Sequence, residues 1–189
     1  YGVVELDEDN RVEYIIEKPT AHEVTSDIIN AGIYAFGTEV FDAIRDTTTI
    51  GELALTDVLG SNLEDMPVRA IPYGRRWLDV SRPWDLVSVN AEVIPDGESN
   101  HSEGTVVDSS AFVSDAVTIG PDSHIYPNST VLRGTAIGEN VSIGPNVSIQ
   151  NSIIMSDTTV RAGAVIGDAV VAENVTIGSN STIPGGRTD

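Results

Sequence analysis

The stretch Val141-Ser142-Ile143-Gly144-Pro145-Asn146-Val147-Ser148-Ile149 decides the fold, because it repeats a six-residue pattern that places an aliphatic residue at Ile143 and at Ile149. A small or β-branched residue stands two positions before each aliphatic. Both can point inward from one short strand, since strand side chains alternate between faces. Apart from two five-residue steps, the six-residue spacing holds through the whole series of aliphatic residues: Val107, Val113, Ile119, Ile125, Val131, Ile137, Ile143, Ile149, Ile154, Val160, Ile166, Val171, Ile177 and Ile183.

Such hexads predict a stack of triangular coils, with three hexads in each coil. The series makes about four to five coils at roughly 4.8 Å per coil, which gives a prism about 20 Å long. The pattern resembles the hexapeptide-repeat superfamily, whose members coil left-handed and commonly trimerise through the faces of the prism. The resemblance implies an all-β, left-handed parallel β-helix over residues 105–189, and a homo-oligomer, specifically a trimer.

Five Asn residues have the form of glycosylation acceptor sites, and each lies three positions before an aliphatic residue of the repeat. Asn tolerates the left-handed backbone conformation that a turn requires. We therefore interpret them as turn residues, with the Ser or Thr of each site in the small inward slot. These residues are Asn128, Asn140, Asn146, Asn174 and Asn180.

The composition excludes several classes of function. The chain has no Cys, so it has neither disulfides nor thiolate metal ligands. A net charge of −19 repels nucleic acid and anionic membranes, and no apolar run reaches the roughly 20 residues that span a bilayer. We expect a soluble, cytoplasmic protein. Carboxylates are abundant and Lys18 is the sole Lys, which favours a halophilic origin, where high salt screens like charges.

The first half of the chain has a mixed α/β pattern. Hydrophobic runs and turn residues predict strands at 2–6, 11–16, 28–36 and 68–73, and helices at 39–45 and 52–63. Ser81 is the expected N-cap of a further helix that ends near residue 94. The polar stretch 95–104 is predicted to be a linker between the α/β part, residues 1–94, and the prism. Because the chain opens at Tyr1, without Met and within an expected strand, we expect it to be a fragment.

Five strings carry a resemblance to sugar-1-phosphate nucleotidylyltransferases of the glucose-1-phosphate thymidylyltransferase type, and they occur in the order seen in that family. The match continues through Arg82-Pro83-Trp84-Asp85-Leu86. Residues 1–94 thus resemble the second half of the family's mixed-sheet domain, and many members carry a hexapeptide-repeat domain next. The strings are Tyr1-Gly2-Val3-Val4-Glu5, Glu17-Lys18-Pro19, Asn30-Ala31-Gly32-Ile33-Tyr34, Leu55-Thr56-Asp57 and Trp77-Leu78-Asp79-Val80.

The resemblance implies a role for five residues. Lys18 would place a positive charge on the phosphates, and Asp79 would bind the Mg²⁺ that bridges them. Glu17 would accept hydrogen bonds from sugar hydroxyls, the Gly2 backbone would lie against the sugar, and Asn30 would line the same pocket. Each also has a structural interpretation: Glu17-Lys18-Pro19 as a turn that ends a strand, Asp79 as a solvated carboxylate, and Asn30 as a partner for local backbone.

The implied reaction joins a hexose-1-phosphate to a nucleoside triphosphate and releases pyrophosphate. Glucose-1-phosphate with dTTP or UTP is the default substrate pair that the resemblance implies. The family grips the triphosphate with a G-x-G-T-R loop, and this sequence contains no such string. We therefore expect the activity to belong to a full-length protein and the chain alone to be inactive.

Two alternatives remain: a hexapeptide-repeat acyltransferase that uses acetyl-CoA and an amino sugar phosphate, and a purely structural trimerisation module. Of the three His residues, His22 lies in a loop and His101 in the expected linker. Only His124 could act as the acyltransferase base, although an ordinary surface role is the simpler interpretation. The resemblance to bifunctional archaeal members that also acetylate implies a His late in the prism, and this chain has Ala162 where that His would fall.

Overall fold

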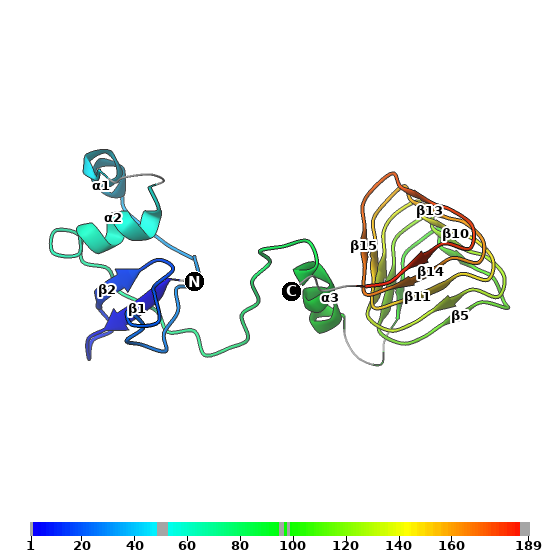
Figure 1. Ribbon diagram of the computed structural model, residues 1–189, viewed down its shortest axis with the longest axis horizontal. Coiled ribbons are helices and arrows are strands. Elements are labelled where there is room, and N and C mark those ends of the chain that lie inside the picture. Colours follow the sequence, from blue (N-terminus) through cyan, green and yellow to red (C-terminus); the bar gives the residue numbers. More distant parts are fainter. Residues whose placement is uncertain (1, 49–52, 95–96, 98, 186–189) are drawn as a thin grey trace. The chain divides into compact units, whose positions relative to one another are not determined.

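The computed structural model describes residues 2–48, 53–94, 97 and 99–185. It divides into two compact units, Tyr1–Trp77 and Leu78–Asp189 (Figure 1). We call them the first and the second unit and describe each by itself. The domain boundaries expected at residues 94 and 105 stay a prediction.

The first unit begins with a β-hairpin. Strands β1 (Val3–Leu6) and β2 (Val12–Ile16) pair antiparallel. The turn between them is held by the Asp7 carboxylate, which accepts hydrogen bonds of 2.8 Å from the backbone N–H groups of Asp9 and Arg11. Asn10 completes the turn in the left-handed conformation, with φ 59°. The hairpin predicted from the sequence is confirmed.

Two short helices follow, α1 (Val40–Asp46) and α2 (Leu55–Ser61). Helix α2 packs against β2, and Gly60 makes the close approach possible, because a Cβ at Gly60 would lie 3.1 Å from the carbonyl oxygen of Ile15. Val4, Ile15 and Leu59 form a small buried core between the hairpin and α2. Both predicted helices exist, but α2 is shorter than the expected 52–63, and residue 52 lies outside the described residues.

The strands predicted at 28–36 and 68–73 are wrong. Each segment makes a single antiparallel bridge, Ile29 with Val3 and Arg69 with Arg11, and then leaves the hairpin. Gly32, with φ 73°, turns the first segment away, and Pro72 has no N–H to donate to a ladder in the second. Ile71 is 90% exposed. The hydrophobic runs therefore do not mark buried strands in the described part of this unit.

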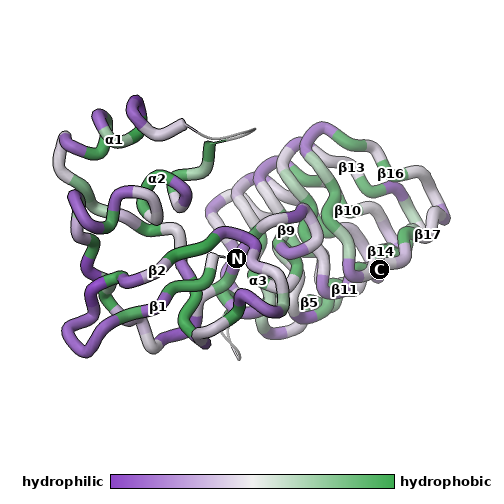
Figure 2. The backbone as a smooth tube through the Cα atoms, turned by 60° about the vertical axis from the view of Figure 1, so that its left-hand side comes forward, coloured by the Kyte–Doolittle hydropathy of each residue, from purple (hydrophilic) through white to green (hydrophobic). Residues whose placement is uncertain are grey.

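The second unit contains the predicted prism, built from three five-stranded parallel sheets. Hydrophobic strands alternate with hydrophilic corners along it (Figure 2). The helix-covered face consists of β3 (Asn100–His101), β6 (Val117–Ile119), β9 (Thr135–Ile137), β12 (Ile153–Ile154) and β15 (Val170–Val171). The histidine face consists of β4 (Val106–Val107), β7 (His124–Ile125), β10 (Ser142–Ile143), β13 (Thr159–Val160) and β16 (Thr176–Ile177). The uncharged face consists of β5 (Phe112–Val113), β8 (Thr130–Val131), β11 (Ser148–Gln150), β14 (Val165–Gly167) and β17 (Thr182–Ile183).

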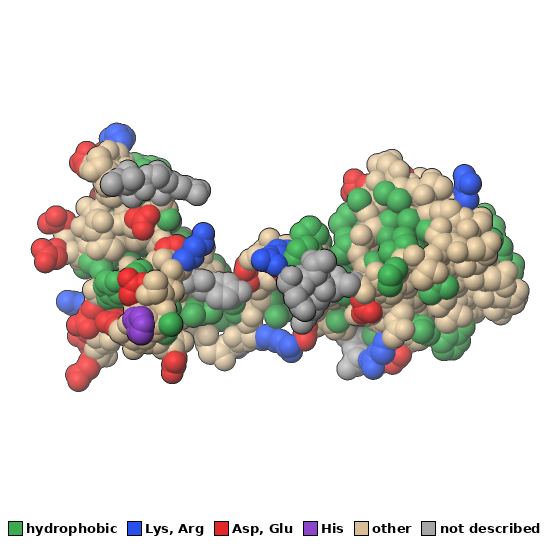
Figure 3. All heavy atoms as spheres, in the orientation of Figure 1, with side chains coloured by type: hydrophobic (Ala, Val, Ile, Leu, Met, Phe, Trp, Pro, Cys, Tyr) green, Lys and Arg blue, Asp and Glu red, His purple; other side chains and the backbone are tan. Residues whose placement is uncertain are grey.

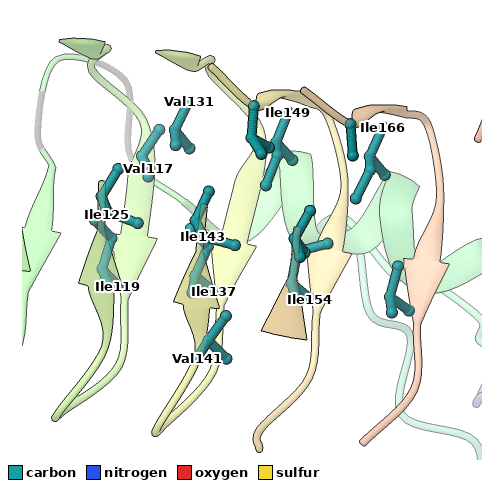
Figure 4. Packing of buried hydrophobic residues seen from close by; sticks show 14 residues of the cluster. Val117, Ile119, Ile125, Val131, Ile137, Val141, Ile143, Ile149, Ile154 and Ile166 are labelled. Carbon is teal, nitrogen blue, oxygen red and sulfur yellow. The ribbon is translucent and has the colours of Figure 1, made fainter. Parts of the chain in front are cut away.

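The aliphatic residues of the repeat fill the interior of the prism, as predicted. Ile125, Ile143 and Val160 occupy the same position in successive coils and are 0% exposed. Figure 4 shows such residues from several coils, among them Ile125, Ile143 and Ile149, pointing into the prism. Stacking in register also lets each coil satisfy the backbone hydrogen bonds of the next, so the repeat builds both the core and the sheets.

The corners of the prism confirm the interpretation of the Asn residues as turn residues. All five have φ between 53° and 59°, in the left-handed region. The Asn140 side chain also links two coils, since its amide donates a 2.7 Å hydrogen bond to the Asp157 carboxylate. The expected place of the hydroxyl residues was wrong. Ser142, for example, is partly exposed on its strand, and the buried slot falls one residue earlier, at Val141.

Two neighbouring coils approach each other closely at Gly120. A Cβ at Gly120 would lie 2.6 Å from the carbonyl carbon and oxygen of Gly138, whereas a Cβ at Gly167 would meet nothing within 4 Å. We expect Gly120→Ala to lower the free energy of unfolding by about 2 kcal/mol, because backbone cannot move aside as a side chain can. Gly167→Ala is the matched control and should change it by less than about 0.5 kcal/mol. Chemical denaturation followed by circular dichroism measures both, and equal effects would contradict this packing.

Helix α3 (Asp85–Val93) covers one face of the prism at β9 and β12. The Asn90 amide donates a 2.8 Å hydrogen bond to the Gly134 carbonyl. Ser81 is not the N-cap: the helix begins at Asp85, whose carboxylate accepts from the backbone N–H groups of Ser81 and Arg82. No helix in the described part of the chain is long and apolar enough to cross a membrane.

The prism starts earlier than the repeat indicates. Strand β3 pairs with β6, His101 opposite Ile119, although 95–104 was expected to be a linker. His101 therefore lies on a strand that pairs with the prism. Residues 95, 96 and 98 are outside the described part of the chain.

Candidate functional site

The end of strand β2 presents the Glu17-Lys18-Pro19 string. The strand ends at Ile16, so the string is indeed a strand-ending turn. Lys18 is exposed and has φ 48°, a left-handed conformation that is uncommon for a non-Gly residue. The following Pro19 also restricts the backbone of Lys18. Strained residues of this kind concentrate at functional sites, and the role predicted for Lys18 stays a prediction.

The structure brings Gly2, Glu17 and Asn30 together. The Gly2 carbonyl accepts a 2.8 Å hydrogen bond from the backbone N–H of Asn30. A Cβ at Gly2 would lie 3.0 Å from Oε2 of Glu17 and 3.4 Å from Cβ of Asn30, so both side chains flank the glycine. A carboxylate and an amide beside bare backbone form a group of hydrogen-bonding atoms suited to a ligand rich in hydroxyls. We call these three residues the Gly2 cluster.

The Asn30 side chain is tied to its own loop. Its carbonyl oxygen accepts from the Gly32 N–H at 2.9 Å, and its amide donates to the Tyr34 hydroxyl. The Tyr34 ring in turn stacks on Phe36, with ring centroids 5.4 Å apart. Asn30 therefore serves local structure, and one amide N–H remains for a ligand. The two interpretations of Asn30 are compatible.

Thr56 is a neighbour of the Gly2 cluster that the sequence analysis did not select. Its hydroxyl lies 3.4 Å from Oε2 of Glu17, and the residue is only 6% exposed. The sequence signal for Thr56 was its place in the Leu55-Thr56-Asp57 string. Such a string does not indicate which distant segment of the chain its residues contact.

Asp79 belongs to the second unit. Its carboxylate accepts a hydrogen bond from the Ser81 hydroxyl, which orients it. Among the described residues no group of three or more His, Cys, Asp or Glu side chains could hold a metal ion. One carboxylate still fits Mg²⁺, which in nucleotide sites binds one or two carboxylates and takes its other ligands from phosphates and water. The roles predicted for Asp79 and for the Gly2 cluster stay predictions.

His124, the alternative acyltransferase base, lies half-buried on the histidine face. Its ring stacks on Tyr126 with centroids 4.1 Å apart. Asp108 is close, but its carboxylate is bound to the hydroxyl and backbone N–H of Ser110. These two bonds lower the pKa of Asp108, and the nearby His124 lowers it further. His124 thus lies beside a carboxylate that is engaged elsewhere.

Comparison with known proteins agrees with the division between an α/β part and a prism. Residues 1–95 match the family described as Nucleotidyl transferase, and residues 98–187 match the EIF2B subunit epsilon LbH domain. The chain belongs to the nucleotidyl transferase family. LbH stands for left-handed β-helix, the handedness that the hexad resemblance implied.

Three curated relatives have similar sequences. The bifunctional protein GlmU of Methanococcus maripaludis is 33% identical over 129 residues, which are 65% of this chain and 31% of the relative. The bifunctional sugar-1-phosphate nucleotidylyltransferase/acetyltransferase of Sulfurisphaera tokodaii is 34% identical over 128 residues, 66% of this chain and 31% of the relative. The low-salt glycan biosynthesis nucleotidyltransferase Agl11 of Haloferax volcanii is 33% identical over 113 residues, which are 58% of this chain and 31% of the relative. The chain thus spans less than a third of the length of these relatives.

Proposed function

We propose that the chain is part of a sugar-1-phosphate nucleotidylyltransferase. In this reaction an oxygen of the sugar-1-phosphate attacks the α-phosphorus of a nucleoside triphosphate. The new P–O bond gives the NDP-sugar, and the bond to the β-phosphate breaks to release pyrophosphate. The observation that carries the proposal is the Gly2 cluster, in which Glu17 and Asn30 flank backbone within a chain of this family.

Each of the residues that the family resemblance selects would act by position and charge. Glu17 and Asn30 hold the sugar hydroxyls and Gly2 leaves room for the ring, so the sugar phosphate is oriented for in-line attack. Lys18 places its ammonium on the phosphates as a compact point charge. Mg²⁺ held by Asp79 would neutralise charge that develops on the phosphate oxygens. In a chain with a net charge of −19, such local cations are what an anionic substrate requires.

The test uses the full-length protein, because the chain covers under a third of each of the three relatives named above. Purified protein with Mg²⁺, glucose-1-phosphate and dTTP or UTP should release pyrophosphate, which a coupled phosphate assay detects. Other hexose-1-phosphates and nucleotides then define the sugar and the base. No pyrophosphate from any pair would overturn the proposal. We place the protein in the cytoplasm, where nucleoside triphosphates are available, and cell fractionation tests that location.

Acetyl transfer is a second candidate function. Two observations favour it: His124 is accessible on the prism beside an aromatic ring, and a similar protein is named as a nucleotidylyltransferase/acetyltransferase. Ala162 argues against it, because the family resemblance implies a His at that position in members that acetylate. Release of free thiol from acetyl-CoA with an amino sugar phosphate, abolished by His124→Ala, would establish this activity. A purely structural module would show neither pyrophosphate nor thiol release.

The prism also offers a surface for assembly. On the uncharged face the outward strand residues are Phe112, Thr130, Ser148, Val165 and Thr182, none of them charged. Phe112 is 58% exposed. In Figure 3 acidic side chains spread over the first unit, while few charged side chains are visible on the prism. The outward strand residues of the histidine face carry no carboxylate either. We assign a homotrimer through the uncharged face because Phe112 and Val165 are exposed apolar residues on it.

Light scattering at high and low KCl measures this assembly. We expect the mass of three chains in molar KCl and of one chain at low salt, because an acidic, halophilic surface needs screening to associate. Phe112→Glu should give a monomer at both salt concentrations, while Val106→Glu on the histidine face serves as the matched control and should leave the trimer intact. A monomeric wild type in molar KCl would contradict the assignment.

A further inference from the structure

A pocket lies between the start of helix α3 and one corner of the prism, and we call it the α3 pocket. Its volume is about 460 Å³, which is in the range of pockets that bind small molecules. Both of its walls belong to the second unit, in which the Asn90 amide ties the helix to the Gly134 carbonyl. Among the residues that line it are Trp84, Asp85 and Val87 on the helix side and Asn151 and Asp168 on the prism side.

The α3 pocket lies where the six-residue repeat is interrupted. The two five-residue steps, 149–154 and 166–171, shorten the same corner of the prism in successive coils. Asn151 and Asp168 occupy these shortened corners, with φ 43° and 48°. A corner that is one residue shorter projects less, so the interruptions leave room beside the helix. The pocket therefore has a cause in the sequence of the prism.

Two carboxylates reach the α3 pocket, one from each wall. Oδ2 of Asp85 accepts from the backbone N–H groups of Ser81 and Arg82, and Oδ1 of Asp168 accepts from the Asn151 amide at 2.6 Å. Each carboxylate thus keeps a second oxygen for a ligand. No basic side chain of the described residues forms an ion pair with either carboxylate. Two unpaired negative charges on opposite sides of one pocket favour a ligand with two positive charges.

The Trp84 ring is a second, independent feature that favours a cation. The guanidinium carbon of Arg82 lies 5.2 Å from the ring centroid, so the ring already holds one cation of the chain. A guanidinium covers one face of a ring, and the other face is left for a ligand. Val87, which is 7% exposed, adds an apolar wall. An apolar wall and a ring suit the methylene stem of an organic cation better than a hydrated metal ion.

We propose that the α3 pocket binds a small organic dication of the diamine class. One ammonium group donates to Asp85 and the other to Asp168, while the methylene chain lies against Trp84 and Val87. The pocket contains no residue of the Gly2 cluster, so the proposal does not depend on nucleotidyl transfer. Because the ligand bridges the helix and the prism, its binding should also hold α3 on the prism.

Isothermal titration calorimetry of the full-length protein with 1,4-diaminobutane, at one fixed KCl concentration, tests the proposal. We expect one ligand per chain with a Kd on the order of 0.1–1 mM, the affinity that two charge-assisted hydrogen bonds can supply. 1,4-Butanediol has the same length without the charges and should give no measurable binding. Lysine amide acetylated at its α-amino group has a single ammonium and should bind at least about tenfold more weakly. Equal or tighter binding of this lysine derivative would overturn the diamine assignment in favour of a Lys side chain of a partner protein.

Asp168→Asn should raise the Kd for 1,4-diaminobutane at least about tenfold, because it removes the charge and keeps an oxygen for the Asn151 amide. Asp157→Asn is the matched control and should change the Kd less than about twofold. Asp157 also lies at a left-handed corner, with φ 58°, and accepts from the Asn140 amide at 2.7 Å, but it does not line the pocket. Trp84→Leu keeps an apolar side chain without the ring and should raise the Kd about three- to fivefold.

Thermal unfolding gives a second readout, because a ligand that binds the folded state raises the midpoint temperature. At about 100 times the Kd, 1,4-diaminobutane should raise the midpoint of wild type and of Asp157→Asn more than that of Asp168→Asn. A diamine attracted only by the net charge of the chain would lose affinity equally in the two Asp variants. Equal losses, equal shifts of the midpoint in all three proteins, or no binding by wild type would each overturn the proposal.

Discussion

Asp79→Asn in the full-length protein should lower the rate of Mg²⁺-dependent pyrophosphate release by about 10³-fold. Asn keeps the size of the side chain and one acceptor oxygen for the Ser81 hydroxyl, but it loses the negative charge that holds the metal ion. The Mg²⁺ concentration for half-maximal rate should rise as well. Initial rates across a Mg²⁺ titration measure both effects.

Asp85→Asn is the matched control for Asp79→Asn. Asp85 also accepts hydrogen bonds within this segment, from the backbone N–H groups of Ser81 and Arg82, at 3.1 and 2.8 Å. Its carboxylate begins helix α3, so its neutralisation should lower stability by about 1 kcal/mol without changing the Mg²⁺ requirement. If the two variants have the same Mg²⁺ dependence, Asp79 is not the metal ligand.

Lys18→Met should lower kcat/KM for pyrophosphate release by about 10²–10³-fold, the effect of removing one preorganised charge from a phosphate in an active site. Lys18 is held with φ 48° in the turn that follows β2, directly after Glu17, so its charge is placed by the same turn that places the carboxylate. Met keeps a long unbranched stem, which isolates the effect of the charge. Stopped-time assays with both substrates varied give kcat and KM separately.

Arg11→Met removes the same charge at the other end of β2 and is the control for long-range electrostatics. The kcat/KM of this variant should stay within about twofold of wild type, because exposed charges at a distance are screened by salt. The kcat/KM of Lys18→Arg should lie between the values of wild type and Lys18→Met, since a planar guanidinium cannot fully replace a compact ammonium. Equal activity of Lys18→Met and Arg11→Met would show that Lys18 has no direct role.

The prism was predictable because its rule is local. Each hexad contains its own inward aliphatic residue, its own small residue and its own turn, and the neighbouring coil obeys the same rule. The left-handed Asn corners followed from the same register. What the period could not show is where the prism begins. Strand β3 has no hexad of its own, and it forms because it pairs with β6.

The α/β part was less predictable, because its elements depend on distant partners. The hydrophobic runs at 28–36 and 68–73 resemble strands, yet each meets the hairpin at one bridge only. Ser81 resembles an N-cap, but its hydroxyl bonds Asp79 while the Asp85 carboxylate takes the backbone N–H groups. The local sequence indicates which residues could cap the helix. Competition between nearby hydrogen-bond acceptors then determines which of them accepts the backbone N–H groups.

The hexad by itself determined the prism, its aliphatic interior and its Asn corners, because those features repeat within six residues. The ordered strings also pointed to Glu17, Lys18 and Asp79 as residues of interest. Only the tertiary structure decided that Glu17 and Asn30 flank Gly2 and that Thr56 lies next to Glu17. These contacts join segments far apart in the chain. The contact between Thr56 and Glu17 forms because α2 packs on β2 through Gly60, and no local pattern encodes that packing.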